Sequence, residues 1–226
     1  MGVARVVLVP FTRLRVSGEV PAGPFILAAN HISPIDPAVL MAACHSRGVA
    51  PTFLADAAVF RLRSVGWIMR RAGHIPVARG THTVTEALAP ATAAVRAGAV
   101  VLVYPEGRIS LDPGLWPEKG KTGTARLALA TGAVVVPVAQ WGTHEVVPYS
   151  APQGAARGLL RSLLRRPRVL VRFGPPLKVT GTAREATEQI IAAITEILVP
   201  LRAGEPDLPR HVDPTRPLST TRSRPR

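Results

Sequence analysis

The sequence predicts an α/β fold, with a single domain in which a central mixed sheet is flanked by helices. Short apolar, β-rich runs alternate with segments of helical period, and 226 residues suffice for one domain with a substantial core but not comfortably for two. We assign residues 1–203 to this domain. Residues 204–226 are rich in Pro, Arg, Ser and Thr and bury too little apolar surface to fold, so we predict a disordered basic tail there.

The predicted strands are short runs of apolar residues. They cover residues 25–29, 51–55, 74–78, 99–104, 133–140 and 168–173. The runs at 99–104 and 133–140 are almost wholly apolar, which is typical of strands buried in the centre of a sheet.

The predicted helices lie between and after these runs. One follows Pro37 and another runs through residues 59–69. A third follows a capping box of Thr83 and Glu86, and Pro90 implies a kink or a later start in it. The remaining predicted helices are a short one at 122–131 that Gly132 stops, a basic one at 157–168, and a final amphipathic one with Ile190, Ile194, Ile197, Leu198 and Leu201 on one side.

The composition limits the partners and the compartment. A formal net charge of +14 attracts phosphate-rich partners such as nucleic acid, anionic lipid or charged cofactors. Cys44 is the only cysteine, which excludes an internal disulfide and a thiolate-rich metal site and fits a reducing cytoplasm. No apolar run approaches the roughly 20 residues that a membrane-spanning helix needs. The N-terminus lacks the cleavage pattern of a signal peptide, so export is not expected.

The stretch NHISPID (30–36) is the first candidate for chemistry. His31 follows the predicted strand at 25–29, and open α/β sheets place their ligand crevices at the carboxyl ends of strands. A compact turn would bring Asp36 back to one ring nitrogen of His31, leaving the other nitrogen to act as a general base. The alternative is that Asp36 caps the helix after Pro37 and His31 makes an ordinary hydrogen bond. The spacing alone favours this alternative, because such pairs are common.

Two further stretches end predicted strands. In YPEGRIS (104–110), Glu106 and Gly107 place a carboxylate and a flexible backbone beside the same crevice. In GHIPVAR (73–79), Arg79 has the planar guanidinium that suits a phosphate. Taken singly, each stretch also fits a turn with solvated charged side chains.

Together with VVPVA (135–139), these stretches resemble the four ordered blocks of the glycerolipid acyltransferase family, of the 1-acylglycerol-3-phosphate acyltransferase type. The resemblance covers roughly residues 14–175. It implies that His31 and Asp36 are the catalytic pair, that Arg79 binds the phosphate of the acceptor, and that Glu106 and Gly107 contribute to acceptor binding. It also implies that a turn at Val136 and Pro137 shapes the acyl side of the cleft.

The third block departs from the family pattern. The family usually has Glu-Gly-Thr-Arg-Ser, whereas this chain has isoleucine at the arginine position, Ile109. Arg108, one place earlier, is the candidate replacement for substrate binding. WPEKGKTG (116–123) resembles the basic stretch that follows this block, which adds Lys121, and Asn30 of the first block is a further substrate-binding candidate.

The resemblance implies an enzyme that moves a fatty acyl chain from acyl-CoA or acyl carrier protein to the free hydroxyl of a lysophospholipid. The favoured acceptor is 1-acylglycerol 3-phosphate, which would give phosphatidic acid for phospholipid biosynthesis. This chemistry needs a base, positive groups that hold the acceptor, and hydrogen-bond donors for an oxyanion. The candidate oxyanion donors are the backbone amides near Gly107. No metal and no cofactor besides the acyl donor are expected. Cys44 is predicted to pack rather than react.

Two stretches predict contact with a membrane. Residues 157–168 place arginines at four-residue intervals beside pairs of leucines, and residues 60–71 combine Trp67 and other apolar residues with arginines. Each arginine near an anionic surface adds about 1 kcal/mol of attraction. We therefore expect a cytoplasmic protein bound peripherally to the inner face of the cell membrane. The alternative for each stretch is a helix whose apolar side faces the core.

Three other functions were weighed. The first is the same transfer to a different lipid or polyol acceptor. The second is a basic nucleic-acid-binding protein, suggested by the charge and the arginine-rich tail, although 4% aromatic residues leave few platforms for base stacking. The third is a metal bound by His31 and Asp36, which lacks a clustered third ligand in the sequence.

Overall fold

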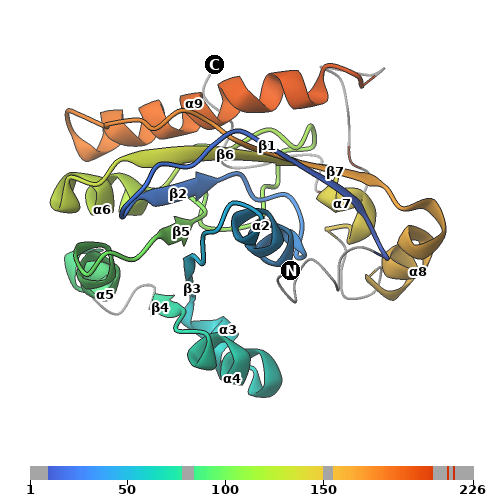
Figure 1. Ribbon diagram of the computed structural model, residues 1–226, viewed down its shortest axis with the longest axis horizontal. Coiled ribbons are helices and arrows are strands. Elements are labelled where there is room, and N and C mark those ends of the chain that lie inside the picture. The colour runs from blue at the N-terminus through green and yellow to red at the C-terminus, as the bar shows by residue number, and fades with distance from the viewer. Residues whose placement is uncertain (1–9, 78–83, 150–154, 206–212, 214–215, 217–226) are drawn as a thin grey trace.

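The computed structural model describes residues 10–77, 84–149, 155–205, 213 and 216. Its strands form one sheet in the order β1-β7-β6-β2-β5-β3-β4, with helices on both faces (Figure 1). The strands are β1 (Arg13–Ser17), β2 (Ile26–Ala29), β3 (Thr52–Asp56), β4 (Ile75–Val77), β5 (Val101–Val103), β6 (Val135–Trp141) and β7 (Arg168–Phe173). Strands β6 and β7 are antiparallel and the other neighbours are parallel, so the sheet is mixed as predicted.

The helices cover most of the intervening chain. They are α2 (Asp36–His45), α3 (Ala57–Arg61), α4 (Arg63–Arg71), α5 (Val84–Arg96), α6 (Gly123–Thr131), α7 (Thr143–Val146), α8 (Ala155–Arg165) and α9 (Ala183–Arg202). None of the helices in the described ranges combines the length and the apolar character needed to cross a membrane.

The core lies on both faces of the central strands. All residues of β2, β5 and β6 are buried, which explains why their sequences are nearly continuous apolar runs. Successive residues of β2 point to opposite faces. Leu27 packs in a cluster with Val39 and Leu40 of α2, whereas Ile26 packs in a cluster with residues of α5, α6 and α9, including Ile190.

Several local predictions differ from the structure. The helix predicted through 59–69 is two helices, because Leu62 is extended (φ −69°, ψ 125°) between α3 and α4. The backbone at Gly66 then passes so close to Phe60 that a Cβ at Gly66 would lie 2.1 Å from its carbonyl oxygen. Pro90 lies inside α5, and the predicted cap residue Thr83 lies outside the described residues.

The predicted turn at Val136 and Pro137 is wrong. Both residues lie within β6, where Pro137 pairs with Ala28 of β2 and its carbonyl accepts the Gly174 amide at 2.8 Å. Proline has no amide hydrogen, so Pro137 leaves no donor without a partner where β6 meets the loop at Gly174. Strand β1 and helix α7 were not predicted.

The helix α8 turns its small residues toward the protein. Ser162 is 1% exposed, and a Cβ on Gly158 would lie 2.5 Å from the Val146 carbonyl oxygen. Leu160 and Leu164 are instead exposed, at 64% and 85%. The alternative of a core-facing apolar side therefore holds for Leu159, which packs against the core, but not for Leu160 and Leu164.

Candidate active site

The first and third sequence motifs meet at one edge of the sheet. Strands β2 and β5 are parallel neighbours, with Ala28 opposite Val103, so the loops that follow them leave the sheet side by side. These loops carry residues 30–35 and 104–110. The carboxyl edge of the central strands is where ligand crevices form in open α/β sheets.

The carboxylate of Asp36 contacts the ring of His31. The distance from His31 Nδ1 to Asp36 Oδ2 is 2.8 Å, and the same oxygen accepts the amides of Ile32 at 2.6 Å and Ser33 at 2.9 Å. The helix begins at Asp36 itself and its N-cap is Ile35, which makes no side-chain capping bond. Asp36 therefore holds the histidine and the preceding loop, and it does not occupy the cap position.

This geometry sets the proton positions on the histidine. Because Asp36 Oδ2 already accepts two amide protons, His31 Nδ1 is the donor to it, and Nε2 is left with a lone pair. The Asp36 side chain is fully buried and the His31 side chain is 15% exposed. The positive end of the α2 dipole adds to the stabilisation of the charged carboxylate.

Tyr104 fixes the plane of the imidazole. Its ring stacks on that of His31, with centroids 4.0 Å apart and planes 16° apart. Burial raises the pKa of Tyr104 well above its ordinary value, and the negative charge of Asp36 raises it further. The phenol is therefore neutral at physiological pH. Tyr104 was not among the predicted site residues, although it ends the run 99–104 and lies two residues before Glu106.

Glu106 braces the loop that carries His31. Its side chain is fully buried, Oε1 accepts the His31 amide at 3.1 Å, and Oε2 accepts the Glu118 amide at 2.9 Å. The Ser110 amide also donates to the His31 carbonyl at 2.7 Å. The first and third motifs are therefore tied together through their backbones. A contact between Glu106 and the acceptor stays a prediction.

Gly107 adopts a conformation that favours glycine, with φ at +68°. A Cβ there would lie 3.1 Å from Lys121 Cδ, so the predicted residues Gly107 and Lys121 are in contact. The Gly107 amide donates to the Tyr104 carbonyl at 2.9 Å and closes a turn. That amide is therefore already engaged, which removes it from the candidate oxyanion donors.

A family model described as Acyltransferase matches residues 13–141, which is more than half of the 226-residue chain and includes both of these loops. The chain belongs to the acyltransferase family.

Curated relatives of this chain include two chloroplast 1-acyl-sn-glycerol-3-phosphate acyltransferases, from Brassica napus (28% identical) and Arabidopsis thaliana (27%), each over 73% of this chain. A lyso-ornithine lipid O-acyltransferase from Pseudomonas aeruginosa is 33% identical over 62% of this chain. These matches cover 47%, 46% and 51% of the relatives, so the chain spans about half their length.

A solved structure shares the fold of this chain. The 1-acyl-sn-glycerophosphate acyltransferase PlsC from Thermotoga maritima matches with a TM-score of 0.67 and 21% identity, over 88% of this chain and 77% of that one. The predicted α/β architecture with one mixed sheet is confirmed by this likeness and by the strand order.

The other predicted binding residues have different surroundings. Arg108 is paired with the buried carboxylate of Glu118, with Nη2 to Oε1 at 3.0 Å and Nε to Oε2 at 3.3 Å. Asn30 is 1% exposed and bonds Gln140 through both ends of its amide, at 2.8 and 3.0 Å, which braces β2 against β6. Arg79 lies outside the described residues. Substrate contacts of these three residues stay predictions.

Two further predictions concern groups beside the site. Burial raises the pKa of the Cys44 thiol to about 12, which makes it a poor nucleophile. Within the described residues, no three His, Cys, Asp or Glu side chains lie together in a way that could hold a metal ion.

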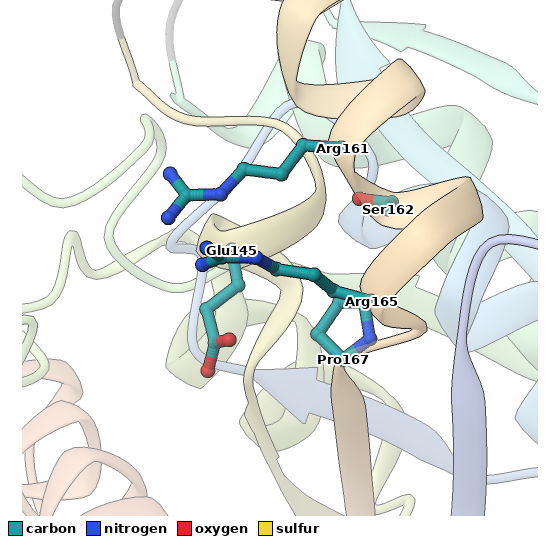
Figure 2. Close-up of a pocket in the computed structure, with 5 residues that line it drawn as sticks. All are labelled: Glu145, Arg161, Ser162, Arg165 and Pro167. Atoms are coloured by element: carbon teal, nitrogen blue, oxygen red, sulfur yellow. The ribbon is translucent and has the colours of Figure 1, made fainter.

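A small cavity lies on the basic helix α8. It has a volume of about 150 Å³ and is lined by Glu145, Arg161, Ser162, Arg165 and Pro167. Figure 2 shows Arg161 and Arg165 extending in the same direction from α8, over the segment that carries Glu145. None of the residues predicted for catalysis or substrate binding lines this cavity.

Proposed function

We propose that this protein is an acyltransferase that moves a fatty acyl chain from an acyl thioester to the free hydroxyl of a lysophospholipid. The observation that carries the proposal is the contact between His31 Nδ1 and Asp36 Oδ2, at the carboxyl edge of the sheet, in a chain of the acyltransferase family. A histidine held by a buried carboxylate suits removal of a proton from an alcohol.

In the proposed reaction, Nε2 of His31 takes the proton of the acceptor hydroxyl while the hydroxyl oxygen attacks the thioester carbonyl. The new C–O ester bond forms and the C–S bond breaks. The proton on Nε2 then passes to the departing thiolate, which leaves as a free thiol. Asp36 stabilises the imidazolium that exists between these two proton transfers, and Tyr104 keeps the ring in plane.

The proposed acceptor is 1-acylglycerol 3-phosphate, and the product is phosphatidic acid. The names of the two plant relatives and the net charge of +14 support a phosphorylated acceptor. In this proposal Arg79 and Lys121 contact the phosphate. Acyl-CoA and acyl carrier protein are both suitable donors, and the reaction needs no further cofactor.

A second acceptor class has its own support. The relative from Pseudomonas aeruginosa is named for a lyso-ornithine lipid, and Arg108 at the altered third motif is bound by Glu118. An acceptor without a phosphate would need fewer cationic partners. Release of free thiol from acyl-CoA, measured with 1-acylglycerol 3-phosphate, with a lyso-ornithine lipid and with an unphosphorylated monoacylglycerol, distinguishes the two classes. Equal slow release with and without every acceptor would overturn the proposed function.

We also propose that the protein binds peripherally to the inner face of the cell membrane. Two helices present apolar side chains to solvent: Trp67 and Ile68 of α4 are 61% and 56% exposed, and Leu164 of α8 is 85% exposed. Arginines flank both groups, which is the arrangement of a helix that lies in a lipid headgroup region. The attached protein would then meet its lipid substrates at the surface of the bilayer.

Sedimentation with vesicles tests the membrane proposal. The paired variant Arg161→Glu and Arg165→Glu should lose most of its binding to vesicles that contain phosphatidylglycerol, because each arginine contributes about 1 kcal/mol at an anionic surface. Arg126→Glu is the control, since Arg126 is exposed and its helix, α6, lies at the opposite end of the molecule from α8 (Figure 1). Equal binding by the paired variant and the control would contradict a role for α8.

A further inference from the structure

Arg216 lies beside the two site loops although it is far from them in the sequence. It falls outside the segment 13–141 that matches the family model, and its side chain is fully buried. Its Nε donates to the Ser110 carbonyl at 2.9 Å, and its Nη2 donates to the carbonyl of Ile32, 184 positions earlier in the chain. One guanidinium therefore bonds the third motif and the first.

The two carbonyls belong to residues whose amides already hold the catalytic pair. The Ile32 amide donates to Asp36 Oδ2 at 2.6 Å, and the Ser110 amide donates to the His31 carbonyl at 2.7 Å. Any movement of Ile32 or Ser110 is thus transmitted to Asp36 or His31. Arg216 holds the same two residues through their carbonyl groups.

Arg216 is itself anchored. Its Nη1 bonds the carboxylate of Asp213, and the Asp213 amide donates to the Pro113 carbonyl at 2.8 Å. Asp213 is 7% exposed, so the pair is shielded from water and from salt. Because Arg216 bonds Asp213 as well as the two backbone carbonyls, its guanidinium is held in one orientation.

The charge of Arg216 also suits its position. Asp36 and Glu106 are buried carboxylates, and buried negative charge is costly unless a positive group compensates for it. Burial lowers the pKa of Arg216 to about 10, and the negative charge of Asp36 is the largest of the effects that oppose this shift. The guanidinium therefore remains protonated at neutral pH and faces the two carboxylates as a cation.

We propose that Arg216 is a positioning residue of the active site, which locks the loops carrying His31 and Glu106. The inference rests on the proposed acyl transfer for its kinetic consequence, but the locking of the loops does not depend on the reaction. Arg216 bonds backbone carbonyls and Asp213, so it acts on the reaction through the loops.

Kinetics of full-length variants test the positioning role. Arg216→Gln should lower kcat for thiol release by about 10- to 100-fold, because displacement of catalytic groups by about 1 Å has an effect of this size. The KM for the thioester should change by less than about threefold. Arg216→Lys should recover part of kcat, and guanidinium ion at low millimolar concentration should recover part of kcat in Arg216→Ala. Arg184→Gln is the matched control, since Arg184 is 87% exposed on α9.

Hydrogen exchange separates this inference from the proposed function. Amide exchange in residues 30–36 and 104–112 should be faster in Arg216→Gln than in the wild type, whether or not acyl transfer is observed. The double variant Asp213→Asn, Arg216→Gln removes the charge of Asp213, which in Arg216→Gln alone loses its arginine partner, and should show the same loss of kcat with better folding. The inference is overturned if that variant melts within about 3 °C of the wild type and keeps kcat within about twofold. Activity higher than that of the wild type would also overturn it, because the loss of a positioning residue should not raise kcat.

Discussion

Replacing Asp36 by asparagine tests the His31 and Asp36 pair without changing its shape. The carboxylate oxygen Oδ2 accepts three donors, at 2.6, 2.8 and 2.9 Å. All three donors share this one oxygen, so asparagine with its oxygen in the same place keeps them, and its NH₂ group takes the position of Oδ1, which has no hydrogen-bond partner in the described part of the chain. The oxygen at the ring is then neutral, so the imidazolium that forms when Nε2 takes a proton loses its negative partner, and proton removal by His31 becomes less favourable.

The expected magnitude follows from the loss of this negative charge. General acid–base catalysis by a positioned group contributes about 10² to 10⁴ in rate, and the variant loses part of this contribution while the ring keeps its tautomer. We expect kcat to fall by about 10² to 10³, which corresponds to about 3 to 4 kcal/mol of transition-state stabilisation. The loss of charged hydrogen bonds should lower the free energy of unfolding by about 2 to 3 kcal/mol, so the variant still folds.

Thiol release from acyl-CoA measures kcat, and thermal unfolding measures the fold. Asp56→Asn is the matched control, because Asp56 also accepts a backbone amide, that of Ala58 at 2.9 Å, and asparagine is an equally good cap there. The control should keep activity within about twofold. A folded Asp36→Asn variant with kcat within tenfold of the wild type would refute the role given to the charge of Asp36.

Two further predictions concern stability. Gly107→Ala should lower the melting temperature by about 2 to 6 °C, because φ of +68° costs a residue with a Cβ about 1 to 2 kcal/mol, and calorimetry checks it. Burial lowers the pKa of His74, whose Nδ1 accepts the Phe53 amide at 3.2 Å. In the unfolded chain this pKa has its ordinary value, so the unfolded chain binds more protons than the folded one below about pH 6.5. Stability should therefore fall as the pH drops below about 6.5, towards the lower pKa of the folded state. Urea unfolding at a series of pH values should show a weaker fall in His74→Gln, and an identical fall in both proteins would contradict the assignment.

The parts of the fold that the sequence predicts are those with a strong local signal. Runs such as 99–104 and 133–140 are apolar because both faces of β5 and β6 are buried, so composition alone identifies them. Strand β1, RLRVS, is half-exposed and follows a less apolar pattern, and α7 has only four residues. The break at Leu62 has no proline or glycine to mark it, and it depends on the close approach of Gly66 to Phe60.

The same distinction applies to the site. The spacing of His31 and Asp36 is local, so a compact turn could be proposed before their contact was known. The stacking of Tyr104 and the amide bond from His31 to Glu106 depend on β2 and β5 being neighbours, which no short stretch specifies. Arg216 lies in a segment whose composition predicts disorder, and only its contacts with Ile32 and Ser110 reveal a different role.

The most direct test of the whole account is thiol release by His31→Gln in the presence of 1-acylglycerol 3-phosphate, compared with the wild type. Glutamine retains a hydrogen-bond donor for Asp36 but has no basic nitrogen. The account predicts acceptor-dependent release by the wild type, a loss of at least about 10³-fold in the variant, and a melting temperature within a few degrees of the wild type. Acceptor-dependent release by a folded His31→Gln variant within tenfold of the wild type would contradict it.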